Sequence, residues 1–238
     1  MKTLVNVRWS SWLLLVGLCA GCLLAVRLPA AWGWANGPLE KLQAMTVCVS
    51  LGVACWAAWQ QRGMAAGKIW CIAMLVWLGL LGRELAWGAV FLPPLEMHAD
   101  SGPLYSSSVL WWKPAVAWVC AAMLLLGLYW VMRFDVLQGV VLRWLRERAM
   151  PWGCWLVWGV ATALAALVES HASGLLVPSD PAGRMVLAAM AQCWAYLALG
   201  WGQWLLVQHM HAWRASSYLQ TLHFSLNSLR EGFERRSM

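Results

Sequence analysis

Long apolar stretches separated by short polar connections dominate the pattern along the chain. Six of them approach the ~20 residues that a helix needs to cross the hydrocarbon core of a bilayer. These stretches lie at 9–26, 42–59, 69–91, 114–132, 151–168 and 184–208. The pattern predicts an all-α, polytopic membrane protein with a six-helix transmembrane bundle over 1–213 and a cytoplasmic amphipathic tail over 214–238. Asp180 and Pro181 together are typical of an N-cap and first residue of a helix.

A first amphipathic stretch lies between the fourth and fifth spans, at 134–148. In a helix its apolar residues would share one face: Phe134, Leu137, Val141, Trp144 and Leu145. Its charged residues would lie opposite: Asp135, Arg143, Arg146 and Glu147. We expect a helix that rests on an anionic membrane surface.

A second amphipathic stretch forms the tail, where large apolar residues follow a 3-4-3-4 spacing. These residues are Leu219, Leu222, Leu226, Leu229 and Phe233. A seam of about two heptads is too short for a stable coiled coil alone. The tail is therefore expected either to dock on the membrane or its own bundle, or to contact a partner or a second copy of the chain.

Composition supports the membrane assignment. The chain is 62% hydrophobic and only 11% charged, whereas soluble domains average roughly 25% charged residues. It also contains 21 tryptophans, and indole rings favour the membrane–water interface. The net charge of +7 does not indicate nucleic-acid binding, because no soluble basic domain exists to carry it.

The basic residues predict the orientation, because cytoplasmic connections are enriched in Lys and Arg. With a cytoplasmic N-terminus, twelve basic residues lie inside: Lys2, Arg8, Arg62, Lys68, Arg133, Arg143, Arg146, Arg148, Arg214, Arg230, Arg235 and Arg236. Four lie outside: Arg27, Lys41, Lys113 and Arg184. We therefore expect a bacterial inner-membrane protein with both termini in the cytoplasm. A cleaved signal segment is the alternative for the N-terminus, where Gly17 and Gly21 form a GxxxG pattern typical of close helix packing.

Arg83 and Glu84 are the most unusual residues, because they place two charges inside the apolar stretch 69–91. A central charge costs about 2.5–3.5 kcal/mol on insertion scales, so both need partners or water. In the predicted topology they occupy the outer half of the membrane. The candidate cluster there contains Arg83, Glu84, Trp87, Glu40, Lys113, Glu169, His171 and Arg184. It is expected to be either an ion-pair network between helices or an outward-opening pocket for a headgroup, ion or substrate.

Metal and redox chemistry find little support in the sequence. The eight cysteines lie in apolar runs and do not form a disulfide framework. No HxxxH or HExxH pair occurs, and we expect no metal and no cofactor. Gln192, a polar residue within the last span, is expected to hydrogen-bond to a neighbouring helix.

Two motifs carry a resemblance. The stretch "NGPLEKLQ" opens the segment 42–59, and "GRELAWG" lies late in 69–91. Together they resemble uncharacterised bacterial multi-pass inner-membrane proteins, with an acidic "GPxE" entry to the second helix and an "(R/E)E(I/L)SWG" motif in the third. Here Ala86 replaces the usual Ser. The resemblance implies six helices and roles for Glu40, Glu84, Trp87 and Gly88, without an activity.

The expected function is that of a non-enzymatic membrane component that binds lipids, or other membrane proteins through its helices and tail, in an envelope assembly or transport system. The alternative is a small intramembrane enzyme or carrier that acts on a lipid or polyprenyl headgroup at the outer leaflet. In that case Glu84 would be the acid/base or cation-binding group, with Arg83, Lys113 or Arg184 contacting an anionic group.

Overall fold

The protein is a bundle of long helices. The computed structural model describes residues 2–98, 102–105, 110–134, 136–170 and 180–236, with side chains for 9–64, 66–97, 102–105, 110–134, 136, 138–170 and 180–212. The α-helices are α1 (Lys2–Ala25), α2 (Pro38–Gln60), α3 (Ala65–Glu84), α4 (Lys113–Arg133), α5 (Leu142–Arg146), α6 (Trp152–Glu169) and α7 (Pro181–Arg236). Two 3₁₀ turns, Ala30–Trp32 and Ala86–Phe91, follow α1 and α3.

Length and composition indicate a membrane protein. Within the part of the chain that the structure describes, five helices are long and apolar enough to cross a bilayer: α2, α3, α4, α6 and the first part of α7, Pro181–Ala212. Helix α1 contributes a shorter apolar stretch, Trp9–Ala25. The predicted helical membrane bundle is confirmed at this level.

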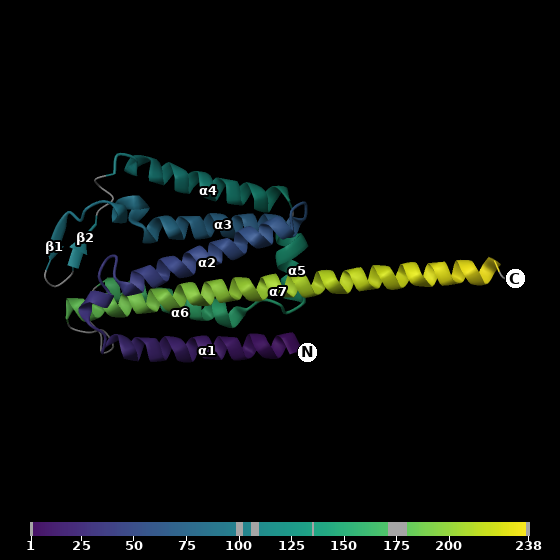
Figure 1. The fold of residues 1–238 in the computed structure, drawn as a ribbon, viewed down its shortest axis with the longest axis horizontal. Coiled ribbons are helices and arrows are strands. Elements are labelled where there is room, and N and C mark those ends of the chain that lie inside the picture. The colour runs from purple at the N-terminus through teal and green to yellow at the C-terminus, as the bar shows by residue number, and fades with distance from the viewer. Residues whose placement is uncertain (1, 99–101, 106–109, 135, 171–179, 237–238) are drawn as a thin grey trace.

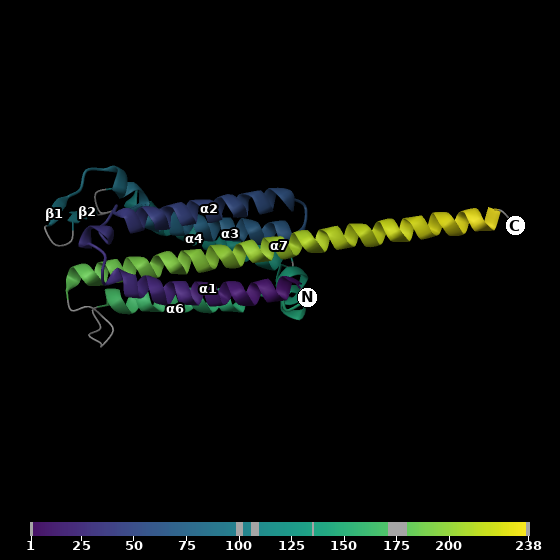
Figure 2. The ribbon, with the colours of Figure 1, turned by 60° about the horizontal axis from the view of Figure 1, so that its bottom comes forward.

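Helix α7 is the axis of the bundle. It packs against α6, α2 and α1, while α3 packs on α2 and α4 packs on α3 at the outer edge. Figures 1 and 2 show the helices running side by side, with the N-terminus and the emerging end of α7 at the same end of the bundle. At that end α5 crosses the bundle, and at the opposite end lie the connections that precede α2 and follow α3.

Small residues allow close packing around α7. Ala191, Ala195 and Ala198 on α7 are at most 1% exposed. The glycines of the GxxxG pattern in α1 face Trp194 of α7, and a Cβ built on Gly17 would lie 2.2 Å from the Trp194 ring atom Cη2. The pattern therefore makes room for an indole ring rather than for a bare helix backbone.

The predicted continuation of the third span to residue 91 is wrong. Helix α3 ends at Glu84, because the next residues enter the left-handed region, with φ values of 44° at Ala86, 55° at Trp87 and 103° at Gly88. A right-handed helix cannot continue through such angles. The Trp87 ring folds back onto Gly82, where an added Cβ would lie 2.8 Å from its Cζ3 atom.

The stretch 134–148 also differs from the prediction. It forms a π-helical turn, Leu137–Val141, followed by the short helix α5. Val136, Val140 and Trp144 are buried, and the last two pack into a core with residues of α2, α3 and α7. Phe134 and Leu145 remain 37% and 40% exposed. The segment is thus docked on the bundle through a face that is mostly different from the predicted one.

Two further features extend the bundle at its opposite ends. The predicted outer loop contains a short antiparallel pair of strands, β1 (Glu96–His98) and β2 (Gly102–Leu104), an addition to the all-α prediction. At the other end α7 continues without a break through the predicted boundary at 213 and projects far beyond the bundle (Figure 1). The side chains of the apolar seam, Leu219, Leu222, Leu226, Leu229 and Phe233, lie outside the described residues.

The packing of α1 on α7 can be tested with one added methyl group. In Gly17→Ala the new Cβ would overlap the Trp194 ring, and we expect a loss of about 1–3 kcal/mol in the free energy of unfolding. Gly52→Ala in α2 is the matched control, because its Cβ would meet nothing within 4 Å. Thermal unfolding in detergent checks both, and equal stability of the two variants would contradict this packing.

Candidate functional site

A polar pocket lies at the end of the bundle where α2 and α7 begin and α3 and α6 end. Its volume is about 280 Å³. Its polar lining residues are Glu40, Gln43, Arg83, Glu84, Glu169 and Gln192, joined by Trp34 from the connection between α1 and α2. Four helices thus contribute polar side chains to one cavity, and ligand sites often lie between the helices of a bundle.

The start of α2 positions Glu40 and Gln43. Pro38 is the first helical residue and follows the N-cap Gly37, so both side chains project from the first two turns. The Glu40 carboxylate accepts a hydrogen bond from the Asn36 backbone N–H. The Gln43 amide donates to the backbone carbonyl of Ala189 at 2.7 Å and thereby ties α2 to α7.

The end of α3 positions Arg83 and Glu84. Because the helix stops there, both residues lie at the edge of the span rather than within it. Tyr196 of α7 is 1% exposed and donates its hydroxyl proton to Glu84 Oε1 at 2.5 Å. The charges of Arg83, Glu40 and Glu169 all act on the Glu84 carboxylate.

The start of α7 confirms the predicted cap. Asp180 Oδ2 accepts a hydrogen bond from the Gly183 N–H at 2.6 Å, and the helix begins at Pro181. Further along, Gln192 Nε2 donates to Tyr196 Oη at 3.0 Å. This contact lies within one helix, whereas the sequence had suggested a neighbouring helix as the partner of Gln192.

The structure brings together four residues of the predicted cluster, Arg83, Glu84, Glu40 and Glu169. The other three described members of the cluster do not line the pocket. Trp87 instead accepts a hydrogen bond at its carbonyl from Trp112 Nε1 at 3.1 Å. Lys113 is exposed at the start of α4, and Arg184 is half-buried in the first turn of α7.

His171, the remaining member, lies outside the described residues. Sequence reasoning missed Trp34, Gln43 and Tyr196. The spacing of Glu40 to Gln43 and of Gln192 to Tyr196 places each pair on one helix face, and this signal could have revealed both.

Metal ligation is not supported by the described side chains, among which no group of three or more His, Cys, Asp or Glu residues could hold an ion. All eight cysteines are free thiols. The pocket's own groups are carboxylates, amides and a guanidinium, which can bind a polar ligand by hydrogen bonds and charge.

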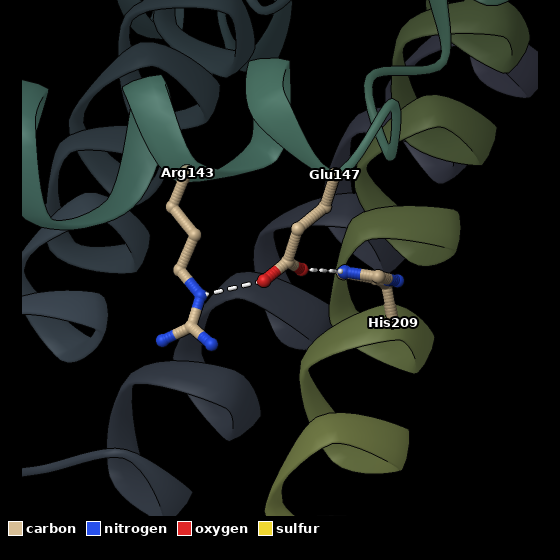
Figure 3. A network of polar contacts seen from close by, with 3 residues as sticks. All are labelled: Arg143, Glu147 and His209. Atoms are coloured by element: carbon tan, nitrogen blue, oxygen red, sulfur yellow. Dashed lines mark hydrogen bonds and ion pairs between the residues drawn. The ribbon is translucent and has the colours of Figure 1, made fainter.

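A separate polar contact joins α5 to α7 at the opposite end (Figure 3). Glu147 accepts a hydrogen bond from Arg143 Nε at 2.8 Å and lies 2.9 Å from His209 Nε2. The Arg143 hydrogen bond, followed by that of His209, lowers the pKa of Glu147, so that its carboxyl group is ionised at neutral pH. These side chains are about one-third exposed or more, so the contact contributes less than about 1 kcal/mol to stability.

Comparisons with known proteins add no family to this description. No protein-family model, curated protein or solved structure matches the chain.

The Tyr196–Glu84 hydrogen bond can be tested by removing one hydroxyl group. Because the Tyr196 hydroxyl group is buried and donates to a carboxyl oxygen, Tyr196→Phe is expected to lower the free energy of unfolding by about 1–2 kcal/mol. Tyr129→Phe is the matched control, since the Tyr129 side chain on α4 is 55% exposed. Unfolding in detergent is the measurement, and a Tyr196→Phe variant as stable as the control would contradict the bond.

Proposed function

We propose that the protein is a bacterial inner-membrane protein with six spans and both termini in the cytoplasm. The apolar stretch of α1 would be the sixth span beside the five longer ones. The end of the bundle where α1 begins and α7 emerges also carries the basic residues of the connections: Arg62, Lys68, Arg133, Arg143, Arg146 and Arg148. The positive-inside rule assigns this end to the cytoplasm, and the pocket then opens on the outer side.

Within this protein, we propose that the pocket binds the polar headgroup of a membrane lipid. The observation that carries this proposal is the convergence of Arg83, Glu84, Glu40 and Glu169 on one cavity at the end of the spans. The cavity of about 280 Å³ lies near the lower end of the usual range for ligand pockets, so a small headgroup suits it better than a large one.

The alternative of an ion-pair network receives less support. Among the residues that the structure describes, no ion pair within 4 Å joins Arg83 to Glu40, Glu84 or Glu169. Arg83 and Glu169 are also exposed. An open cavity whose charged groups do not pair with one another is better suited to binding a ligand than to holding the helices together.

The proposed role is that of a non-enzymatic component of an envelope assembly or transport system. The lining groups recognise and hold a headgroup, and the projecting helix α7 offers a surface to a partner protein. One observation favours the alternative of an enzyme or carrier: Tyr196 holds Glu84 in a fixed position, as an acid/base group requires. Chemically altered headgroups that appear only when Glu84 is present would favour that alternative.

Lipid binding can be tested by purifying the full chain in mild detergent and quantifying the bound lipids and proteins by mass spectrometry. Arg83→Gln and Glu84→Gln each remove a charged hydrogen-bonding group, and we expect roughly tenfold less bound lipid. Lys113→Gln is the matched control for Arg83→Gln, because Lys113 lies at the same end and does not line the pocket.

Unfolding measurements on the same samples separate a binding defect from a folding defect. Wild-type protein that retains no lipid, or variants that retain as much as wild type, would contradict the proposed pocket function.

A further inference from the structure

The hydrogen-bond acceptors of the pocket are incompletely used. Gln43 and Gln192 line it and are only 4% and 8% exposed. Both amide nitrogens already donate, to the Ala189 carbonyl and to Tyr196 Oη. Since the Tyr196 proton goes to Glu84, these donor and acceptor assignments are fixed by the partners. Among the described residues, the hydrogen bonds of both glutamines are made through Nε2, and none reaches the carbonyl oxygen Oε1 of either side chain.

A buried glutamine elsewhere on α7 uses both ends of its side-chain amide. Gln203 lies deeper in the bundle and is 8% exposed. Its Nε2 donates to the Ser50 carbonyl at 2.9 Å, and its Oε1 accepts from the Trp77 indole N–H. Gln203 therefore uses both ends of its amide, as buried polar groups normally do, whereas the pocket glutamines use one end.

The unused acceptors require a ligand that donates. The carboxylates of Glu40, Glu84 and Glu169 also line the pocket. An ionised carboxylate accepts hydrogen bonds and cannot donate one. A metal ion would need these ligands gathered closely, and no such group is found among the described side chains. An ammonium group suits the site, because it carries a positive charge and three N–H donors that can reach separate acceptors.

The pocket also presents donors. Arg83 lines it, and so does Trp34, whose buried Nε1 has no hydrogen-bond partner in the described part of the chain. The Trp34 ring packs against Gly102 and occupies the space that a larger side chain would need, since a Cβ on Gly102 would lie 2.4 Å from the ring atom Cδ2. The strand pair thus covers the ring, and a guanidinium and an indole N–H are left to bind an anionic group.

We propose that the pocket recognises a primary ammonium group joined to a phosphate, the chemistry of a phosphoethanolamine headgroup. The carboxylates and the two glutamine carbonyls bind the ammonium, and Arg83 and Trp34 bind the phosphate. This inference rests on the proposed headgroup pocket and names its ligand. A trimethylammonium headgroup has no N–H donors for these acceptors. A glycerol headgroup donates through hydroxyl groups, but it has no positive charge to balance the carboxylates.

Native mass spectrometry of the full chain in detergent tests this selectivity. The protein is given equal amounts of phosphatidylethanolamine, phosphatidylcholine and phosphatidylglycerol with identical acyl chains. We expect phosphatidylethanolamine to be retained roughly tenfold over each of the others, as the loss of charged hydrogen bonds implies. Glu40→Gln and Glu169→Gln should each reduce this preference, and Glu96→Gln, which removes a carboxylate outside the pocket, should not.

A second arm adds soluble phosphoethanolamine, which separates a lipid source from a soluble one. Displacement of the bound lipid by the soluble compound supports ammonium–phosphate recognition. Binding of the soluble compound by a protein that retains no lipid also supports this recognition, but it contradicts a lipid as the source of the headgroup. A preference for phosphatidylglycerol, or equal retention of all three lipids, would overturn the inference and leave headgroup binding intact. Binding of neither lipid nor soluble compound would overturn both proposals.

Discussion

The hydrogen bond from Tyr196 to Glu84 joins the end of α3 to the central helix α7. It gives a carboxyl group in an apolar bundle the donor that it needs. A carboxylate inside a membrane helix must find donors or water. Here α3 ends at Glu84, so the carboxylate faces a polar cavity on one side and a buried hydroxyl group on the other. The left-handed residues 86–88 make this possible, because they stop the helix before it carries the charges further.

Helix α7 connects this polar end to the rest of the molecule. Its alanines allow α1, α2 and α6 to approach closely, and its polar residues bind across the bundle. Gln203 holds α2 and α3 through the Ser50 carbonyl and the Trp77 indole with both ends of its amide. At the pocket Gln192 uses only its nitrogen. One helix therefore contains a polar residue that serves packing alone and another that leaves an acceptor open to the cavity.

The sequence predicted the five long apolar helices and four of the residues that line the cavity, because both follow from the cost of burying charge. Counting basic residues in the connections placed Glu40, Arg83, Glu84 and Glu169 at one end, and the structure groups them around one pocket. Lys113 failed to join them, because residues at the same end of a bundle can still project from different faces.

Other features could not be predicted, for physical reasons. The end of α3 depends on positive φ angles at Ala86 and Trp87, which L-residues rarely adopt and which tertiary packing must impose. The buried face of 134–148 depends on a π-helical turn that shifts the helical periodicity. Trp34 belongs to an irregular connection, so no periodic pattern links it to the pocket.

The central claim is that the polar pocket opens on the outer side of the membrane while α7 projects into the cytoplasm. Paired reporter fusions test it most directly. Alkaline phosphatase is active only on the outer side of the membrane, and green fluorescent protein fluoresces only when it remains in the cytoplasm. We expect fusions after Met238 to fluoresce and to lack phosphatase activity, and fusions after Leu104 to show phosphatase activity and no fluorescence. Phosphatase activity after Met238 together with fluorescence after Leu104 would contradict the account.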